Sequence, residues 1–160
     1  MQEVIIKSDY ELERGKPMPG KNHGFIQTKL AILISRSCED KYEVASEINV
    51  SINGNVKVPD LAIFQEATYT PGYDEINVEE APVGVIEILS PKQSLADLIV
   101  KSYEYFKAGV KSYWLVLPET KTIYVYYAPN EYYAYFQKGI LKDNNLDIEI
   151  DIAKVFKVKK

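Results

Sequence analysis

The sequence predicts a mixed α/β fold (α+β in some schemes), in which helices flank a central sheet of parallel and antiparallel strands. Val83–Leu89 is a nearly continuous apolar run typical of a central strand, a helical pattern covers Ser94–Gly109, and Val110–Leu117 is the next strand. Because a full helix separates the two strands, we expect them to be parallel neighbours. Asn53-Gly54, between two alternating segments, is a strong hairpin signal and adds antiparallel strands.

Local patterns predict the two main helices and the segment before them. Apolar spacing predicts a first helix that begins at an Asn22 cap and ends near Ser37, with a buried stripe of Ile26, Leu30, Leu33 and Ile34. Glycine and prolines in Tyr10–Pro19 predict an extended or turn-rich lead-in. The buried face of the second helix is expected to consist of Leu95, Leu98, Ile99, Ser102, Tyr103 and Phe106.

Two hairpins and an ambiguous tail complete the expected elements. The turn at Asn53-Gly54 should join strands over Val44–Ile52 and about Asn55–Phe64. Thr122–Tyr127 and Glu131–Gln137 predict a second, tyrosine-rich hairpin. The tail fits two structures, because LDIEIDI alternates like a strand and the overlapping DIAKVF could begin a short helix.

Composition is that of an ordinary globular protein. The chain has 160 residues, 46% hydrophobic and 26% charged, so we expect one domain over residues 1–160. No apolar run reaches the roughly 20 residues that a membrane span needs, and the start lacks the basic and then apolar order of a signal peptide. The single cysteine, Cys38, cannot form an internal disulfide. A cytoplasmic protein without membrane contact is therefore expected.

The residue types present restrict the metals and the mode of nucleic-acid binding. One cysteine excludes a multi-thiolate site, and one histidine leaves oxygen atoms as the main ligands, which favours Mg²⁺ or Mn²⁺ over zinc. The net charge of -4 counts against binding nucleic acid through bulk electrostatics. Residues 58–91 contain seven acids and no Lys or Arg, typical of a solvated loop, whereas the last seven residues include four lysines.

Glu87 stands inside the apolar Val83–Leu89 strand, which should be covered on both faces. Burying a carboxylate costs several kcal/mol unless its charge is compensated. A buried ion pair or an exposed strand end would explain the residue without a function. A metal ligand is the functional interpretation, because the metal would supply the missing positive charge.

Asp60 is a second acid next to an apolar run, LAIF. It also follows Pro59, and an acid in a proline turn needs no functional explanation. A two-residue turn at Asn53-Gly54, counted back along both strands, sets Glu47 opposite Asp60. Acids that face each other across strands repel, so this pair favours a cation between them. A bulge near Pro59 would change the register.

Lys101 flanks the buried stripe of the helix that directly follows the Glu87 strand. By itself it would be a solvated lysine with Asp97 one turn away, a pair worth a few tenths of a kcal/mol. Because the helix must pack back on the sheet, its ammonium group can instead reach the carboxylates of Asp60 and Glu87. These three residues form the candidate catalytic set.

Three motifs occur in a fixed order: VPDLAIF, GVIEILSP and Asp97-x3-Lys101-x3-Tyr105-x3-Gly109-Val110-x2-Tyr113-Trp114-Leu115. Upstream of them lie YELERGKPMPG and His23. In this order and spacing they resemble the Uma-two family of restriction-endonuclease-like proteins, within the PD-(D/E)XK nuclease superfamily. The resemblance extends from about Tyr10 to Tyr127.

The resemblance implies a restriction-endonuclease-like core, with the tyrosine-rich hairpin added, and a metal-dependent endonuclease whose expected substrate is DNA. Asp60 and Glu87 would ligate Mg²⁺ or Mn²⁺ together with the backbone carbonyl of Ile88. Lys101 would orient the attacking water or stabilise the transition state. The superfamily usually has its lysine two positions after the second acid, where this chain has Leu89, and the family's lysine maps onto Lys101.

Accessory roles are expected for Glu47, as a further ligand or an acceptor behind the ligands, and for His23 with Gln27, one helical turn apart. For His23 the alternative is an exposed residue at the helix start. Six tyrosines between Tyr124 and Tyr135 either pack in the sheet, form a homodimer face or stack on bases.

Two other functions stay open. One is a nuclease fold kept as a catalytically weak or inactive module for binding or assembly, which the negative net charge and Leu89 favour. The other is a hydrolase of a smaller phosphodiester, which needs no basic groove.

Overall fold

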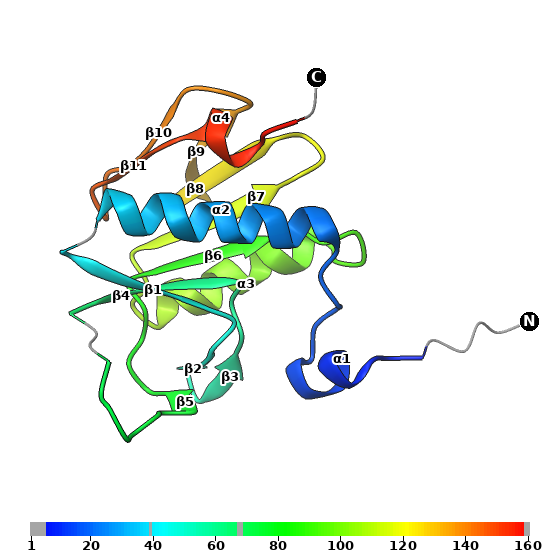
Figure 1. Cartoon of the computed structure of the whole chain (residues 1–160), viewed down its shortest axis with the longest axis vertical. Helices are drawn as coiled ribbons and strands as arrows, with labels where there is room; N and C mark the ends of the chain where they lie inside the picture. The colour runs from blue at the N-terminus through cyan, green and yellow to red at the C-terminus, as the bar shows by residue number, and fades with distance from the viewer. Residues whose placement is uncertain (1–5, 39, 67–68, 159–160) are drawn as a thin grey trace, which may run out of the picture.

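The computed structural model of the chain describes residues 6–38, 40–66 and 69–158; the two lysines that end the sequence lie outside these ranges. A six-stranded mixed sheet with strand order β1-β4-β6-β7-β8-β9 forms the centre (Figure 1). Its strands are β1 (Tyr42–Ser46), β4 (Leu61–Gln65), β6 (Gly84–Ile88), β7 (Ser112–Leu117), β8 (Thr122–Ala128) and β9 (Glu131–Phe136). The smaller sheets are β3-β2-β5, built from Asn55–Lys57, Asn49–Ile52 and Asn77–Val78, and β10-β11, built from Ile140–Asp143 and Ile148–Asp151.

Helices cover both faces of the central sheet. The long helix α2 (Lys21–Ser37) packs on one face with the β10-β11 hairpin and α4 (Ile152–Val155), and α3 (Leu95–Lys107) packs on the other (Figure 1). The predicted parallel pairing of the strands on either side of α3 is confirmed, since β6 and β7 are parallel. None of the helices in the described ranges combines the length and apolar character that a membrane crossing requires.

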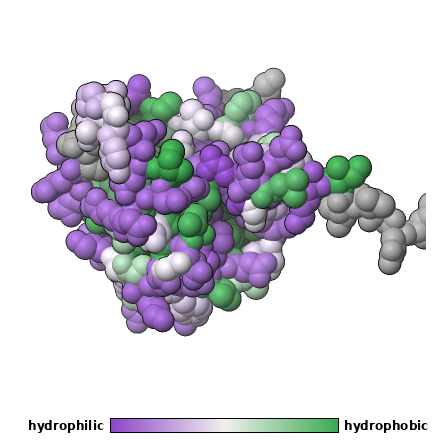
Figure 2. Space-filling model, turned by 90° about the horizontal axis from the view of Figure 1, so that it is seen from below, coloured by the Kyte–Doolittle hydropathy of each residue, from purple (hydrophilic) through white to green (hydrophobic). Residues whose placement is uncertain are grey.

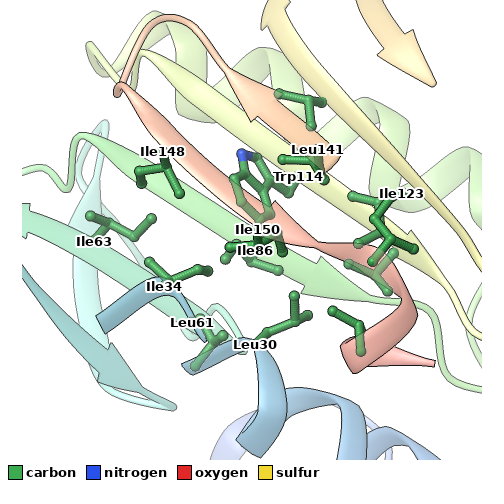
Figure 3. Close-up of a cluster of buried hydrophobic side chains, with 14 of the residues drawn as sticks. Leu30, Ile34, Leu61, Ile63, Ile86, Trp114, Ile123, Leu141, Ile148 and Ile150 are labelled. Carbon is green, nitrogen blue, oxygen red and sulfur yellow. The ribbon is translucent and has the colours of Figure 1, made fainter. Parts of the chain in front are cut away.

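The larger core lies between α2 and the sheet. Leu30 and Ile34 of α2 meet branched residues of four neighbouring strands and the buried Trp114 ring (Figure 3). Alternate residues of the same strands face α3 and form a second core. Strands buried on both faces therefore read as continuous apolar runs, which is the pattern that predicted them.

The hairpin predicted at Asn53-Gly54 is confirmed, because Ile52 pairs with Asn55. Each predicted strand is nevertheless divided in two: the inner parts, β2 and β3, belong to the small sheet, and the outer parts, β1 and β4, belong to the central one. The register passes through this break without a net slip. It runs from Val50↔Lys57 in the small sheet to Ser46↔Leu61 in the central sheet, four residues along each strand.

The helix that opens at Ser94 starts as predicted, but the segment before α2 and the start of α2 itself differ from the prediction. The segment Tyr10–Pro19 is helical in its first half, because Ser8 and Glu11 form a capping box that begins α1 (Asp9–Arg14). Its second half, after Gly15, is not helical. Helix α2 starts earlier than expected, with Gly20 as its N-cap, so Asn22 lies inside the helix.

The buried face of α3 is rotated from the predicted stripe. Leu98, Ser102 and Tyr105 are buried, whereas Leu95 and Tyr103 are each 39% exposed. Sequence periodicity missed Tyr105 because tyrosine is compatible with either face. The rotation turns the Lys101 side of the helix toward the sheet.

The predicted tyrosine-rich hairpin is confirmed, because β8 and β9 are antiparallel neighbours at one edge of the central sheet. Both structures predicted for the tail are present, since the strand β11 is followed directly by the short helix α4. Tyrosine rings pack in pairs across β8 and β9, including Tyr126 with Tyr132 and Tyr127 with Tyr133. Tyr132 and Tyr133 also remain about half exposed. The homodimer and base-stacking roles stay predictions.

Seen from below, the surface is mainly hydrophilic, with apolar side chains in separate spots (Figure 2).

Candidate active site

Asp60 and Glu87 meet at the ends of two neighbouring strands. The β4–β6 register pairs Leu61 with Ile86, so one further step along both strands sets Asp60 opposite Glu87. On its other side Asp60 faces Glu47, whose backbone N–H lies 3.3 Å from the Asp60 carbonyl oxygen. Asp60 is 3% exposed and Glu87 1% exposed. Three acids are thus aligned across adjacent strands, and two of them are buried.

Four groups hold Asp60. Its Oδ1 lies 2.9 Å from Lys16 Nζ, and its Oδ2 lies 3.1 Å from His23 Nε2 and accepts a 2.8 Å hydrogen bond from the Ile88 backbone N–H. Gln27 Nε2 donates to the Asp60 backbone carbonyl at 3.2 Å. Burial by itself would raise the pKa of Asp60, but the bonds to His23 and Ile88 and the charge of Lys16 lower it below its usual value. The carboxylate is therefore ionised.

Glu47 anchors the segment that precedes α2. Its carboxylate accepts a hydrogen bond from the Tyr10 hydroxyl and lies 3.3 Å from Lys16 Nζ, and its backbone carbonyl accepts from the Arg14 guanidinium. The cation predicted between Glu47 and Asp60 is thus the ammonium group of Lys16. Burial alone would lower the pKa of Lys16, but the charge of Asp60 raises it above its usual value, so the side chain stays protonated.

Glu87 receives its partners from α3. Its Oε1 lies 3.4 Å from Lys101 Nζ and 3.4 Å from the Tyr105 hydroxyl. Burial and the neighbouring charge of Asp60 raise the pKa of Glu87 to about 7, and the attraction of Lys101 only partly offsets them. Burial and Glu87 also raise the pKa of Tyr105 far above its usual value, so this residue is a neutral hydrogen-bond donor.

The space beside Asp60 is nearly closed. Lys16, Pro17, Pro19 and His23 are among the residues that line it, and what remains is too small to admit a water molecule. Because His23 and the Ile88 N–H already bind Oδ2 of Asp60, a ligand would have to bind Oδ1, and Lys16 occupies that position.

The donor set suits a magnesium-type ion in part. Within the described ranges, no three His, Cys, Asp or Glu side chains lie together as a metal cluster. Two neighbouring carboxylates are nevertheless present, and Mg²⁺ is commonly held by one or two carboxylates, with waters and substrate phosphates as its other ligands. Asp60 and Glu87 therefore fit such an ion, provided that Lys16 moves away from Oδ1.

The structure places every predicted site residue near the paired acids. His23, Gln27 and the Ile88 backbone N–H contact Asp60, Glu47 is linked to Asp60 through Lys16, and Lys101 contacts Glu87, which lies opposite Asp60 in the strand register. His23 is 5% exposed, so the alternative of an exposed residue at the helix start is wrong. For Glu87, the ion pair with Lys101 is present, and the metal-ligand role stays a prediction.

Sequence reasoning missed Lys16 and the direct role of Tyr105. The only signal for Lys16 was its place in YELERGKPMPG, which does not say that a loop lysine will be buried.

A third buried acid, Asp143, was also missed. It accepts hydrogen bonds from Ser112 Oγ and Trp114 Nε1, two neutral donors, and lies outside the cluster. It anchors the Trp114 ring of the core.

Comparison with known proteins agrees with the fold and with the motifs. No curated protein matches the chain. A solved structure from Anabaena variabilis, described as "a putative nuclease belonging to DUF820", superposes with a TM-score of 0.77 at 23% sequence identity, covering 88% of this chain and 83% of that one. That likeness shows a shared nuclease fold. The pattern of the Uma2 family, described as "Putative restriction endonuclease", matches residues 7–150. This family match supports a nuclease-like function, and the chain belongs to the Uma2 family.

Proposed function

We propose that this protein is a metal-dependent endonuclease that hydrolyses phosphodiester bonds of nucleic acid, with DNA as its substrate. The observation that carries the proposal is the pairing of Asp60 with Glu87 at the ends of β4 and β6, both buried and each with a lysine beside it. Two adjacent acids can hold a divalent cation, and two lysines beside them can pair with the negative charge of a phosphate.

Asp60 and Glu87 would hold Mg²⁺ or Mn²⁺, with the Ile88 carbonyl as the expected backbone ligand. The cation, when bound, would lower the pKa of a water molecule and neutralise charge on the phosphate. It would also favour the ionised form of Glu87, whose pKa near 7 reflects burial beside Asp60. The Ile88 backbone N–H and His23 fix the orientation of the Asp60 carboxylate.

The two lysines act on the substrate in this proposal. Lys101 is 28% exposed and only 3.4 Å from Glu87, so its ammonium group can reach both the carboxylate and a molecule in front of it. There it would orient the attacking water or stabilise negative charge in the transition state. Lys16 would leave Asp60 when the cation binds and would then be free to pair with a phosphate oxygen. This exchange requires Lys16–Pro19 to shift, because that segment closes the space beside Asp60.

A cleavage assay with three substrates tests the proposal. Plasmid DNA, single-stranded DNA and bis(p-nitrophenyl) phosphate are incubated with the protein and Mg²⁺ or Mn²⁺, and EDTA serves as the metal-free reference. We expect cation-dependent cleavage of DNA, and its loss in Asp60→Asn. Asp147, whose side chain is 90% exposed, provides the control, since Asp147→Asn should cleave like the parent. Cleavage of the small ester alone would favour a hydrolase of smaller phosphodiesters.

The alternative function, a nuclease fold kept for binding or assembly, is favoured by one observation. Asp60 and Glu87 already have protein cations as partners, Lys16 and Lys101. Calorimetric titration with Mn²⁺ separates the two proposals. A nuclease should bind the ion and lose this binding in Asp60→Asn, whereas a module without catalysis should show no binding in either protein.

A further inference from the structure

A groove of about 430 Å³ lies beside the first half of α2, against the turn after β7 and the segment that follows α4. Its volume is within the range of sites that hold small molecules. The residues that decide its chemistry are Lys21, Phe25, Lys29, Lys121, Phe156 and Lys157. None of the site residues Asp60, Glu87 and Lys101 lines it, so it is separate from the candidate active site.

The groove is strongly basic in a protein that is acidic. Four lysines line it, and no acidic side chain of the described ranges does. The chain has a net charge of -4, so with these four positive charges set apart the remainder carries -8. Such a local concentration of one sign attracts an anionic partner that the protein as a whole would repel. It also removes the objection that the net charge raises against nucleic-acid binding.

The spacing of residues on α2 adds a flat aromatic surface to the charges. Lys21, Phe25 and Lys29 follow one another at intervals of four, so they form a stripe along one side of the helix. Phe25 is 58% exposed between the two lysines, although burial would be favourable for its ring. An exposed aromatic ring flanked by cations is the arrangement with which proteins stack unpaired bases and hold the adjacent phosphates.

The same helix reaches the candidate active site from another side. His23 and Gln27, which hold Asp60, each stand two positions after a groove residue, which is a rotation of about 200° around the helix axis. The first two turns of α2 thus separate the groove from the acids.

We propose that this groove binds a single-stranded segment of nucleic acid, by base stacking on Phe25 and phosphate contacts to the four lysines. The proposal rests on the proposed function for the identity of the polymer. A single strand is favoured over a duplex because paired bases cannot stack on a side chain at the surface. It assigns a binding surface outside the residues that cleave.

Fluorescence anisotropy in EDTA tests binding without cleavage. The probes are a labelled thymidine oligonucleotide, a labelled duplex of the same length and a labelled polyglutamate peptide, each titrated at several salt concentrations. We expect the single strand to bind most tightly. In Lys21→Gln/Lys29→Gln the slope of log K against log salt should fall by about 1.4, since each phosphate contact to a single strand contributes about 0.7. Phe25→Ala should weaken binding roughly 5- to 150-fold with an unchanged slope.

Matched controls separate the groove from general surface effects. Lys107→Gln/Lys138→Gln removes two exposed lysines elsewhere, and Tyr69→Ala removes a ring that is 88% exposed on a loop. Both should bind like the parent, and circular dichroism melting should show all variants folded. Equal loss in the control variants, preference for the duplex, or preference for polyglutamate would each overturn the proposal.

The groove proposal and the proposed function can fail separately. Hydrolysis of bis(p-nitrophenyl) phosphate, which is too small to span both places, should be the same in the groove variants as in the parent. If the parent cleaves nothing but binds the single strand through Phe25 and the lysines, the nuclease proposal fails and the groove proposal stands. If it cleaves DNA while the groove variants bind like the parent, the groove proposal fails alone.

Discussion

Lys16 and Asp60 form an ion pair 2.9 Å long whose side chains are only 10% and 4% exposed, although the residues are 44 positions apart. The ammonium group also lies 3.3 Å from Glu47. It therefore occupies the position between two facing acids for which the strand register predicted a cation. A divalent metal that binds Asp60 must compete with this lysine, and the site's affinity for metal depends on that competition.

Replacing Lys16 should have opposite effects on stability and on metal affinity. Without metal, Lys16→Met leaves Asp60 buried without its main cation, and breaking such a pair typically costs about 3–5 kcal/mol in the free energy of unfolding. With the competing charge removed, the affinity for Mn²⁺ should rise. Denaturant unfolding in EDTA and calorimetry with Mn²⁺ measure the two effects.

Lys57 provides the control for this substitution. It pairs with Glu104 at 2.7 Å, but the two side chains are 22% and 45% exposed. Lys57→Met should therefore cost no more than about 1 kcal/mol and leave Mn²⁺ affinity unchanged. An unchanged Mn²⁺ affinity in Lys16→Met would show that the lysine does not stand in the metal position.

Glu87 should make the metal-free protein less stable as the pH rises. Its pKa is raised from 4.5 to about 7 in the folded state, so between these values the folded protein binds more protons than the unfolded chain. The stabilising contribution is complete below about pH 4.5 and is lost as the pH rises through about 7, a change on the order of 3 kcal/mol. Asp60, whose pKa is lowered, contributes in the opposite sense and only at lower pH.

Glu87→Gln removes this titration. Unfolding free energies in EDTA, measured from pH 4.5 to 8, should fall with pH in the parent and stay nearly level in the variant. Glu149→Gln alters an acid whose side chain is 59% exposed and should follow the parent curve. If the parent and Glu87→Gln lose stability in parallel, the carboxyl group does not titrate in this range.

Lys101 should affect catalysis far more than metal binding. Lys101→Ala removes a cation 3.4 Å from Glu87 but leaves both carboxylates in place, so the Mn²⁺ affinity should change little. Loss of a positioned cation typically raises the barrier by about 2–4 kcal/mol, which slows cleavage roughly 30- to 1000-fold. Lys101→Arg should restore only part of the rate, because a planar guanidinium cannot replace a point charge.

Lys107→Ala is the matched change on the same helix, at an exposed position, and should leave the rate of DNA cleavage unaltered. Single-turnover rates for the three variants give the comparison. Equal rates in Lys101→Ala and the parent would reduce the site to two acids and favour the binding-module function.

His23 should act through Asp60. Its Nε2 lies 3.1 Å from Asp60 Oδ2, and groups that orient a ligand in this way typically contribute 10- to 100-fold to metal affinity. His23→Leu should weaken Mn²⁺ binding by about that factor. Gln27→Leu removes a bond only to the Asp60 backbone and should have a smaller effect. Calorimetry that finds the order reversed would assign the orientation of Asp60 to its backbone instead.

The order of the main helices and strands, the parallel pair around α3 and the alignment of Glu47 with Asp60 could be predicted from the sequence, whereas α1 and the division of the first hairpin into two sheets could not. The predictable features follow from local rules: apolar periodicity assigns each element, and a two-residue turn leaves a hairpin one register, which here passes Pro59 unchanged. The choice of Asp60, Glu87 and Lys101 as partners also came from local anomalies, charged residues within or beside apolar segments.

Two features of the site follow from long-range packing alone: Lys16 fills the space beside Asp60, and Tyr105 faces Glu87. The position of Lys16 depends on contacts that Tyr10 and Arg14 make with Glu47, more than 30 positions away, and no periodicity records such contacts. The rotation of α3 is set by packing against the sheet, because Tyr103 and Tyr105 have the same intrinsic helix propensity, which therefore does not decide which of them is buried. Local rules thus specify the elements and their register, and the balance of charges in the site arises only when distant segments pack together.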